Sequence, residues 1–237
     1  MKIMPYLVGV MFSLTAWSAN ADKAVEENIT HALQRIVPDV EITRIRSTPI
    51  ENLYEVMLGP DVIYISGDGR FIFRGDLLDL QEKRNLSEDQ RSLVRKEVLS
   101  NLPEKEYIEF APAKIEHVVY VFTDVDCAYC RRFHQDVPVL NENGVTVRYL
   151  AFPRGGIGTH TFNVMQAVWC SVDRNQALTD AKNGIPIKAN QCPNPVEKHF
   201  LLGQKFGIRG TPAIYLEDGQ ELPGYTPPDE LLRLVRK

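Results

Sequence analysis

The chain has 237 residues, with 27 lysines and arginines against 31 aspartates and glutamates, and a formal net charge of −4. Hydrophobic residues make up 44% and charged residues 24% of the sequence, which excludes a globally disordered or collagen-like chain. A mildly acidic chain lacks the broad positive field that nucleic-acid binding needs, so no nucleic-acid partner is expected. The length fits one large domain or two small ones.

The first 21 residues have the pattern of a secretory signal peptide. Lys2 supplies a positive charge, an apolar stretch follows, and Ala19–Ala21 has small residues where signal peptidase cleaves. A membrane anchor is the alternative, but the apolar stretch is shorter than the ~20 residues that span a bilayer. We therefore expect cleavage after Ala21 and export to an oxidising compartment, in which disulfides persist.

The sequence pattern of residues 22–83 predicts one helix on a small antiparallel sheet. Apolar residues recur at the spacing of one helix face, at Val25, Ile29, Leu33 and Ile36. Strand-like runs follow at 40–45, 53–58, 62–66 and 70–74. The turn Gly67–Gly69 favours a hairpin between the last two runs. Because a unit of ~60 residues buries a modest core, we hypothesise that it dimerises through a sheet edge.

Residues 84–103 predict a helix between two domains. Ser87 is its expected N-cap, and Gln90 completes a capping box three positions later. The helix has a narrow apolar stripe at Leu93, Val94, Val98 and Leu102, with charges over the rest of its surface. A spacer between domains and a solvated helix packed on one domain by an edge both fit this pattern.

The sequence pattern of residues 104–237 predicts a second domain, of the α/β class. Strands are expected at 106–110, 117–122, 145–152 and 213–216, and a mainly helical stretch at 159–207. Further helices are expected to begin near Cys127 and at Pro228, where proline suits a first turn. Strands that alternate with helices in this way are typical of an α/β domain.

The chemistry of the sequence is concentrated at Cys127 and Cys130. This CxxC motif directly follows the nearly all-apolar strand 117–122 and opens a helix. Two cysteines three residues apart on a first helical turn can close a small disulfide ring. The free N–H groups and the dipole at the helix N-terminus favour a thiolate on the first of them. We expect Cys127 to be the exposed attacking sulfur and Cys130 the buried resolving thiol.

A zinc site and an inert disulfide are the alternatives for a lone CxxC motif. Zinc would need Cys170 and Cys192 as the other half of the site, and the 21 residues between them are a loose spacing for a zinc ribbon. A strand, a CxxC motif and a helix in an exported α/β domain favour redox chemistry, so no metal is expected. Asp124 and Asp126 flank the motif, either as a proton acceptor for Cys130 or as turn and capping groups.

Thr211 and Pro212 stand just before the strand at 213–216. An X-Pro bond adopts cis at modest cost. A cis-proline beside a CxxC motif leaves the neighbouring backbone free to pair with a substrate strand and keeps metal ions from the two thiols. A trans turn proline is the alternative on spacing alone. Tyr129, inside the motif, is a candidate for shaping the reactivity of the sulfurs and contacting substrate.

Five segments together resemble one family. They are Phe122–Cys130 (FTDVDCAYC), Val147–Arg154 (VRYLAFPR), Trp169-Cys170, Gly210–Ala213 (GTPA) and Pro223–Pro228 (PGYTPP). They are similar to the DsbC family of bacterial periplasmic thiol:disulfide interchange proteins, over essentially the whole chain after the signal peptide. The resemblance implies a thioredoxin-like catalytic domain with a helical insertion at 104–237. It also implies an N-terminal cystatin-like dimerisation domain at 22–83 and a linker helix at 84–103.

The resemblance also implies an activity and partners. The family isomerises disulfides in misfolded exported proteins, with chaperone-like binding, as a periplasmic homodimer. A membrane-bound thiol-disulfide reductase donates its electrons, and no diffusible cofactor is needed. By resemblance, Cys127 and Cys130 are the redox-active pair and Thr211 with Pro212 forms the facing cis-proline loop.

Cys170 and Cys192 match the second, structural disulfide of the family. The residues themselves favour the same interpretation, because Trp169 indicates a buried setting and a closed loop of this size contributes ~3 kcal/mol. A second redox pair is the alternative.

The dipeptide between the active-site cysteines departs from the family. It is Ala-Tyr here, whereas Gly-Tyr is usual for the isomerases and Pro-Tyr for the related DsbG branch. A DsbG-like reductase of sulfenylated cysteines is therefore one alternative function, and a holdase chaperone that mainly binds apolar chains is another. Oxidases of the DsbA type carry valine before the cis-proline, so Thr211 argues against an oxidase.

Overall fold

The computed structural model describes residues 23–188 and 191–236. The expected signal peptide lies outside these residues. The chain divides into two compact units, one formed by the residues up to Val56 with Tyr64–Phe73 and the other by Met57–Ile63 with the residues from Arg74 onward.

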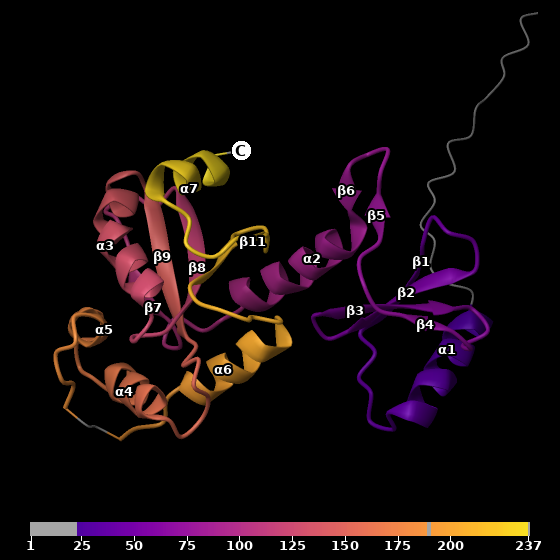
Figure 1. Cartoon of the computed structure of the whole chain (residues 1–237), viewed down its shortest axis with the longest axis horizontal. Helices are drawn as coiled ribbons and strands as arrows, with labels where there is room; N and C mark the ends of the chain where they lie inside the picture. Colours follow the sequence, from indigo (N-terminus) through magenta and orange to yellow (C-terminus); the bar gives the residue numbers. More distant parts are fainter. Residues whose placement is uncertain (1–22, 189–190, 237) are drawn as a thin grey trace, which may run out of the picture. The chain divides into compact units, whose positions relative to one another are not determined.

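The N-terminal region is a helix and a four-stranded sheet, as the sequence predicts. The elements are α1 (Lys23–Ile36), β1 (Arg44–Ser47), β2 (Leu53–Leu58), β3 (Asp61–Ser66) and β4 (Ile72–Phe73). The strand order is β1-β2-β3-β4 (Figure 1). The first strand begins later than expected from the run at 40–45, and the fourth is shorter than the run at 70–74.

The hairpin between β3 and β4 brings the sheet close to α1. Ile29, Ala32 and Leu33 form the buried face of the helix. Gly69 has a φ of +69°, and a Cβ there would lie 2.6 Å from the Cβ of Ala32. Glycine is therefore required at this turn, both for the backbone conformation and for the close approach.

Strands β5 (Leu78–Asp79) and β6 (Arg84–Asn85) form a small hairpin before α2 (Leu86–Ser100). The expected N-cap at Ser87 is wrong. Asn85 is the N-cap, because its side-chain oxygen accepts a hydrogen bond from the backbone N–H of Glu88 at 3.0 Å. The Ser87 hydroxyl instead accepts the N–H of Leu77 at 2.8 Å and holds the hairpin segment against the first turn.

The C-terminal half of α2 packs into the second unit. Leu99 is buried in an apolar cluster with Tyr120 and Phe122. The buried Arg95 forms ion pairs with Glu88 and, at 3.3 Å, with Glu221. This packing favours the interpretation of a helix joined to one domain by an edge.

The second unit is built on a five-stranded sheet of order β11-β10-β8-β9-β7. The strands are β7 (Ile108–Phe110), β8 (His117–Thr123), β9 (Val145–Ala151), β10 (Ala213–Leu216) and β11 (Glu221–Leu222). Strands β8 and β9 are parallel, and the remaining pairs are antiparallel. The sheet positions the site because β8, at its centre, ends directly before the CxxC motif.

Helices cover both faces of this sheet (Figure 1). They are α3 (Ala128–Glu142), α4 (His160–Trp169), α5 (Arg174–Lys182), α6 (Val196–Lys205) and α7 (Pro228–Val235). Val119 and Val121 of β8 pack in one apolar cluster, and Tyr120 and Phe122 in the other. The nearly all-apolar run at 117–122 is thus explained, because alternate side chains enter two separate apolar clusters. Helices α4–α6 form the expected helical insertion between β9 and β10.

Candidate active site

Cys127 and Cys130 lie where the sequence predicts, at the start of α3. Cys127 is the N-cap residue, in an extended conformation, and Cys130 lies in the first helical turn. Both are free thiols. The expectation that Cys127 is exposed is wrong, since it is 3% exposed, whereas the expectation that Cys130 is buried is confirmed, since it is 0% exposed. Cys127 is the more accessible of the two.

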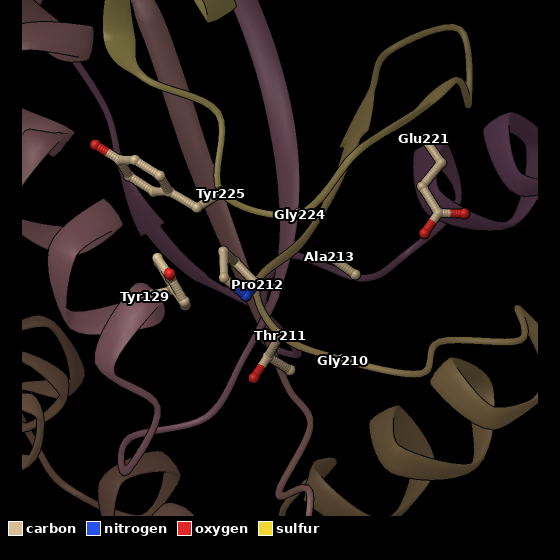
Figure 2. A pocket seen from close by; sticks show the side chains of 8 residues that line it. All are labelled: Tyr129, Gly210, Thr211, Pro212, Ala213, Glu221, Gly224 and Tyr225. Atoms are coloured by element: carbon tan, nitrogen blue, oxygen red, sulfur yellow. The ribbon is translucent and has the colours of Figure 1, made fainter.

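The loop before β10 faces the attacking cysteine. The Thr211–Pro212 peptide bond is cis, as predicted, and the Cys127 thiol donates a hydrogen bond to the carbonyl oxygen of Thr211 at 3.1 Å. Beside this loop is a groove of about 530 Å³, lined by Tyr129, Gly210–Ala213, Glu221, Gly224 and Tyr225. Figure 2 shows Tyr129 and Tyr225 on one side of Pro212 and Glu221 on the other.

Two aromatic side chains form one wall of the groove. Tyr129 is 65% exposed, and its ring stacks on that of Tyr225 with centroids 6.2 Å apart. The hydroxyl of Tyr225 donates a hydrogen bond to Asp136 at 2.8 Å, and the guanidinium of Arg132 lies over its ring. The pair offers an apolar surface held in place from α3, which suits contact with an unfolded chain. Tyr225 belongs to the PGYTPP segment, but nothing in its spacing indicated this contact.

The surroundings of Cys127 favour its thiolate. Burial by itself raises the pKa of this thiol, but hydrogen bonds from Thr211 and Cys130 and the positive charge of Arg154 outweigh it. The net effect is a pKa below the ordinary value. The Thr211 hydroxyl is buried without a hydrogen-bond partner among the described residues, so it is available to the sulfur when Cys127 ionises.

The pKa of Cys130 is raised instead, mainly by burial. The positive charge of Lys182 and hydrogen bonds from Thr211 and Thr123 act in the opposite direction without cancelling it. The two sulfurs therefore differ in the way that an attacking and a resolving thiol require.

The loop between β8 and the motif is held by Asp124 and Arg154. The buried carboxylate of Asp124 accepts the backbone N–H of Asp126 at 2.7 Å and that of Arg154 at 2.9 Å. The Arg154 guanidinium donates to the same carboxylate at 3.1 Å. Asp126 accepts hydrogen bonds from Arg131 and Thr161. Both aspartates are thus bonded within the loop, which favours a turn and capping role over proton transfer.

Lys182 is a further charged group near the cysteines, and sequence reasoning missed it. It is the last residue of α5 and is buried, with its ammonium donating to the Thr123 hydroxyl at 2.7 Å. A single lysine at the end of a short polar helix gives no signal in the sequence that distinguishes it from a surface lysine. His134, on α3, also points inward and contacts Tyr149 and Thr179.

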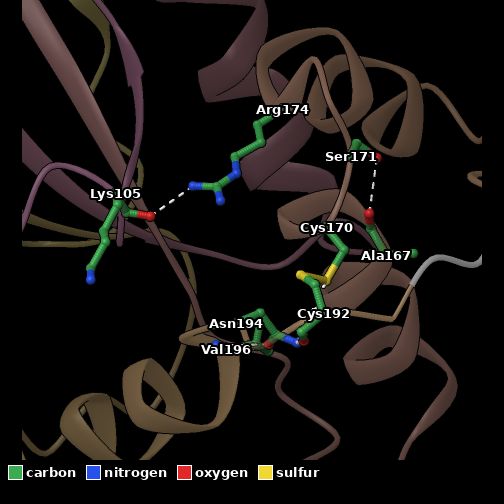
Figure 3. Close-up of a disulfide and its surroundings, with 8 residues drawn as sticks. All are labelled: Lys105, Ala167, Cys170, Ser171, Arg174, Cys192, Asn194 and Val196. Atoms are coloured by element: carbon green, nitrogen blue, oxygen red, sulfur yellow. Dashed lines mark hydrogen bonds between the residues drawn. A yellow bond between two sulfur atoms is a disulfide. The ribbon is translucent and has the colours of Figure 1, made fainter.

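Cys170 and Cys192 form a disulfide with Cα atoms 5.6 Å apart (Figure 3). The bond connects the end of α4 to the segment before α6 and encloses α5. Because these two cysteines are bonded to each other, they cannot complete a zinc site with the CxxC motif. In residues 23–188 and 191–236 no cluster of three or more histidine, cysteine or acidic side chains is placed to hold a metal ion. Within the same residues no helix has the length and apolarity of a membrane span.

The geometry of the second unit is that of a thioredoxin-like dithiol oxidoreductase, and the comparison with protein families agrees. Residues 105–237 match the model of a thioredoxin-like domain. Residues 18–88 match the model of a disulfide bond isomerase protein N-terminal domain. The chain belongs to the DsbC family of thiol:disulfide interchange proteins. The predicted family and fold class are thereby confirmed.

Individual relatives cover nearly the whole chain. The thiol:disulfide interchange protein DsbC of Dickeya dadantii is 34% identical over 227 residues, which are 95% of this chain and 93% of the relative. DsbC of Pasteurella multocida is 37% identical over 224 residues, which are 94% and 92% of the two chains. The crystal structure of a disulfide interchange protein from Neisseria gonorrhoeae superimposes with a TM-score of 0.51 and 28% identity, covering 57% of this chain and 99% of that one.

Proposed function

We propose that this protein isomerises wrong disulfides in exported proteins, with Cys127 as the nucleophile and Cys130 as the resolving thiol. The single observation that carries the proposal is the contrast between the two sulfurs. Cys127 has a lowered pKa and contacts Thr211, which lines the groove, whereas the pKa of Cys130 is raised by burial. A nucleophile that is a thiolate and a partner that stays protonated allow the mixed disulfide to persist long enough for reshuffling.

The reaction begins when the Cys127 thiolate attacks one sulfur of a substrate disulfide. A bond forms between Cys127 and that sulfur, and the other substrate sulfur leaves as a thiolate. The freed thiolate can attack a different substrate disulfide, which forms a new disulfide and displaces another substrate thiolate. A substrate thiolate then attacks the substrate sulfur of the mixed disulfide, so a substrate disulfide forms and Cys127 leaves as the thiolate. Electrons are redistributed within the substrate, and the net reaction is isomerisation.

Cys130 resolves the mixed disulfide when the substrate does not rearrange. Its thiolate attacks the Cys127 sulfur, the bond to the substrate breaks, and the substrate is released reduced while Cys127 and Cys130 become a disulfide. A thiol donor must then reduce this pair. In our proposal the donor is a membrane-bound thiol-disulfide reductase, which also reaches Cys127 through the groove.

The groove is proposed to hold the substrate chain. Thr211 and Pro212 offer backbone next to Cys127, and Tyr129 offers an exposed aromatic surface. These groups recognise an extended, partly apolar chain and no particular side chain, which suits misfolded proteins as substrates. They also support chaperone-like binding.

The N-terminal region is proposed to form a homodimer in the periplasm. Strand β4 is at the edge of its sheet, and Phe71 and Phe73 beside and within it are 55% and 56% exposed. An apolar edge strand is a template for pairing with a second copy. Residues 22–83 are the proposed dimerisation domain, 84–103 the linker and 104–237 the catalytic domain, and residues 1–21 a cleaved signal peptide.

The proposal is tested by reactivation of a scrambled multi-disulfide protein with catalytic amounts of the reduced chain, starting at Asp22. We expect reactivation by the parent and none by Cys127→Ser. Cys130→Ser is the matched control, because it removes one sulfur of the same motif but leaves the nucleophile. It should retain part of the activity and accumulate mixed disulfides with substrate.

Two results would contradict the proposal. Equal reactivation by Cys127→Ser would exclude dithiol chemistry and, if aggregation is still suppressed, would indicate a holdase. Absent reactivation with rapid reduction of a sulfenylated cysteine would indicate a DsbG-like reductase.

A further inference from the structure

Lys182 is a buried cation close to the resolving cysteine, and the reaction described above does not use it. The residue is 3% exposed. Its ammonium donates a hydrogen bond to the Thr123 hydroxyl at 2.7 Å and lies 5.3 Å from the ring centroid of Tyr149. In the described part of the chain no carboxylate forms an ion pair with it. A buried charge without an ionic partner is costly, so its position calls for a function.

Thr123 connects this lysine to Cys130. The Thr123 side chain is fully buried at the end of β8. Its oxygen accepts from Lys182, which leaves the hydroxyl proton free to be donated. In the other direction the hydroxyl favours the Cys130 thiolate and acts to lower the pKa of Cys130. Lys182 of α5 is thus hydrogen-bonded to Thr123 of β8, and Thr123 in turn acts on Cys130 of α3.

We propose that Thr123 and Lys182 are a proton relay for the Cys130 thiol. The proposal rests on the resolving role of Cys130 in the proposed function. Cys130 needs such a route because it is fully buried, so its proton cannot pass directly to bulk solvent. Asp124 is poorly suited as the acceptor, because its carboxylate already accepts the N–H groups of Asp126 and Arg154.

The relay step moves one proton at each of two links. Cys130 gives its proton to the Thr123 oxygen, and Thr123 gives its own proton to the neutral amine of Lys182. The pair changes from thiol and amine to thiolate and ammonium, with no change in total charge. The Cys130 thiolate then attacks Cys127 in the mixed disulfide, and the substrate sulfur leaves with the bonding electrons and takes a proton from solvent. When the pair is reduced again, the proton returns to Cys130.

The amine form of Lys182 is accessible near neutral pH. Burial, the largest influence, lowers the pKa of Lys182 to about 8, although the nearby cysteines and Asp124 favour its charged form. The charged and titratable groups that face it from the packed elements are Cys127, Asp124, Cys130, Arg131, His134 and Tyr149. Because the lysine and Cys130 interact, we expect them to titrate as a pair.

The test measures the ionisation of Cys130 directly. In the chain with Cys127→Ser, Cys130 is the one remaining free thiol, and the 13C shift of its labelled Cβ reports its titration. We expect Lys182→Met, which keeps the length of the side chain, to raise the Cys130 pKa by about one unit or more. Thr123→Val keeps the volume but removes the hydroxyl, and should also raise it. Lys205→Met removes an exposed lysine of α6 and should leave the value unchanged.

A kinetic measurement adds a readout that packing alone would not produce. With Cys127 intact and joined to a peptide, a tenfold loss of thiolate is partly offset by higher nucleophilicity. Release of the peptide by Cys130 should therefore slow about threefold at pH 7 in Lys182→Met. The slowing should disappear at a pH above the raised pKa of Cys130. A defect in packing would persist at every pH.

An unchanged Cys130 pKa in folded Lys182→Met would overturn the relay. If that variant does not fold, Thr123→Val decides in the same way. Neither titration uses a substrate disulfide, so both test the relay alone. The reactivation assay, in which Lys182 is present, tests the proposed isomerase, so the failure of one proposal is distinguishable from the failure of the other.

Discussion

The sulfur of Cys127 lies 3.1 Å from the carbonyl oxygen of Thr211, a residue 84 positions further along the chain. Two separate segments therefore form the site, one at the start of α3 and the other before β10. The Thr211 hydroxyl is buried nearby, so a single residue places both a backbone carbonyl and a hydroxyl beside Cys127, and in the proposed function it offers backbone to a substrate.

Thr211→Val is expected to raise the pKa of Cys127. The valine is isosteric but cannot donate a hydrogen bond to the thiolate, and a net hydrogen bond of ~1 kcal/mol corresponds to somewhat less than ~1 pH unit. Thiolate absorbance at 240 nm, followed against pH in a Cys130→Ser background, measures the change. Thr211→Ser keeps the hydroxyl and should restore the parent value. Equal pKa values in the valine and serine variants would contradict this role.

Arg154→Gln is expected to raise the pKa of Cys127 by a smaller amount. The charge of Arg154 favours the thiolate, but its side chain is 48% exposed, so solvent ions screen the effect. The pKa of Cys127 should therefore depend less on salt in this variant than in the parent. Arg233→Gln, on the surface of α7, removes an equal charge as the control. The same salt dependence in all three proteins would rule out the effect.

Stability is expected to fall between pH 6.5 and pH 4 because the folded protein holds the half-buried His134 in its neutral form. Burial and the charge of Lys182 lower its pKa from 6.5 to about 4. In that interval the unfolded chain binds a proton that the folded chain does not, so the free energy of unfolding decreases as the pH falls. At 1.36 kcal/mol per pKa unit, the loss of stability is at most about 3.4 kcal/mol.

Urea unfolding at several pH values measures this dependence. His134→Gln should show a shallower decline, whereas His160→Gln, which replaces an exposed histidine, should follow the parent. A parallel decline in all three proteins would contradict the assignment. His199 adds to the decline in each of them, because burial lowers its pKa to about 3.

The Cys170→Ala/Cys192→Ala double variant is expected to lose about 3 kcal/mol of stability. The disulfide closes a loop with a sequence separation of 22, and the cost follows from the freedom that its loss gives the unfolded chain. Urea unfolding under oxidising conditions measures the difference, while the reactivation assay at low temperature should show retained activity. A stability equal to that of the parent, or complete loss of activity in the folded variant, would disagree with a structural role.

Deletion of residues 22–83 is expected to leave a folded monomer that reduces disulfides but isomerises them poorly. Both apolar clusters around the five-stranded sheet consist of residues from Val98 onward, so the core of the catalytic domain remains whole. Sedimentation gives the oligomeric state, and reduction and reactivation assays give the two activities. Undiminished isomerisation by the shortened chain would contradict a role for dimerisation.

Local sequence patterns predicted most of the elements, and long-range contacts account for the errors. Apolar residues in succession predicted that β8 is buried on both faces, as Val119 and Phe122 are. The chemistry of a helix N-terminus predicted the position of Cys127. The N-cap was misplaced because Ser87 is engaged by Leu77, a contact that no pattern of neighbours reveals.

The site itself was predicted in part. The cysteines and Thr211 carry recognisable motifs. The burial of Lys182 could not be predicted, because lysine is usually exposed. It depends on how the helical insertion folds back toward β8.

One domain of this protein holds two cysteine pairs in opposite redox states. Cys170 and Cys192 are oxidised while Cys127 and Cys130 are reduced, and Cys192 is the more exposed to solvent. Burial therefore does not shield the structural bond from a reductant. A reductant that acts on any accessible disulfide would loosen the segment that carries Lys182, whereas one that docks in the groove beside Pro212 would spare it. In the proposed function, a protein that corrects the disulfides of others thus depends for its own stability, though not for its activity, on one disulfide that an oxidant must form.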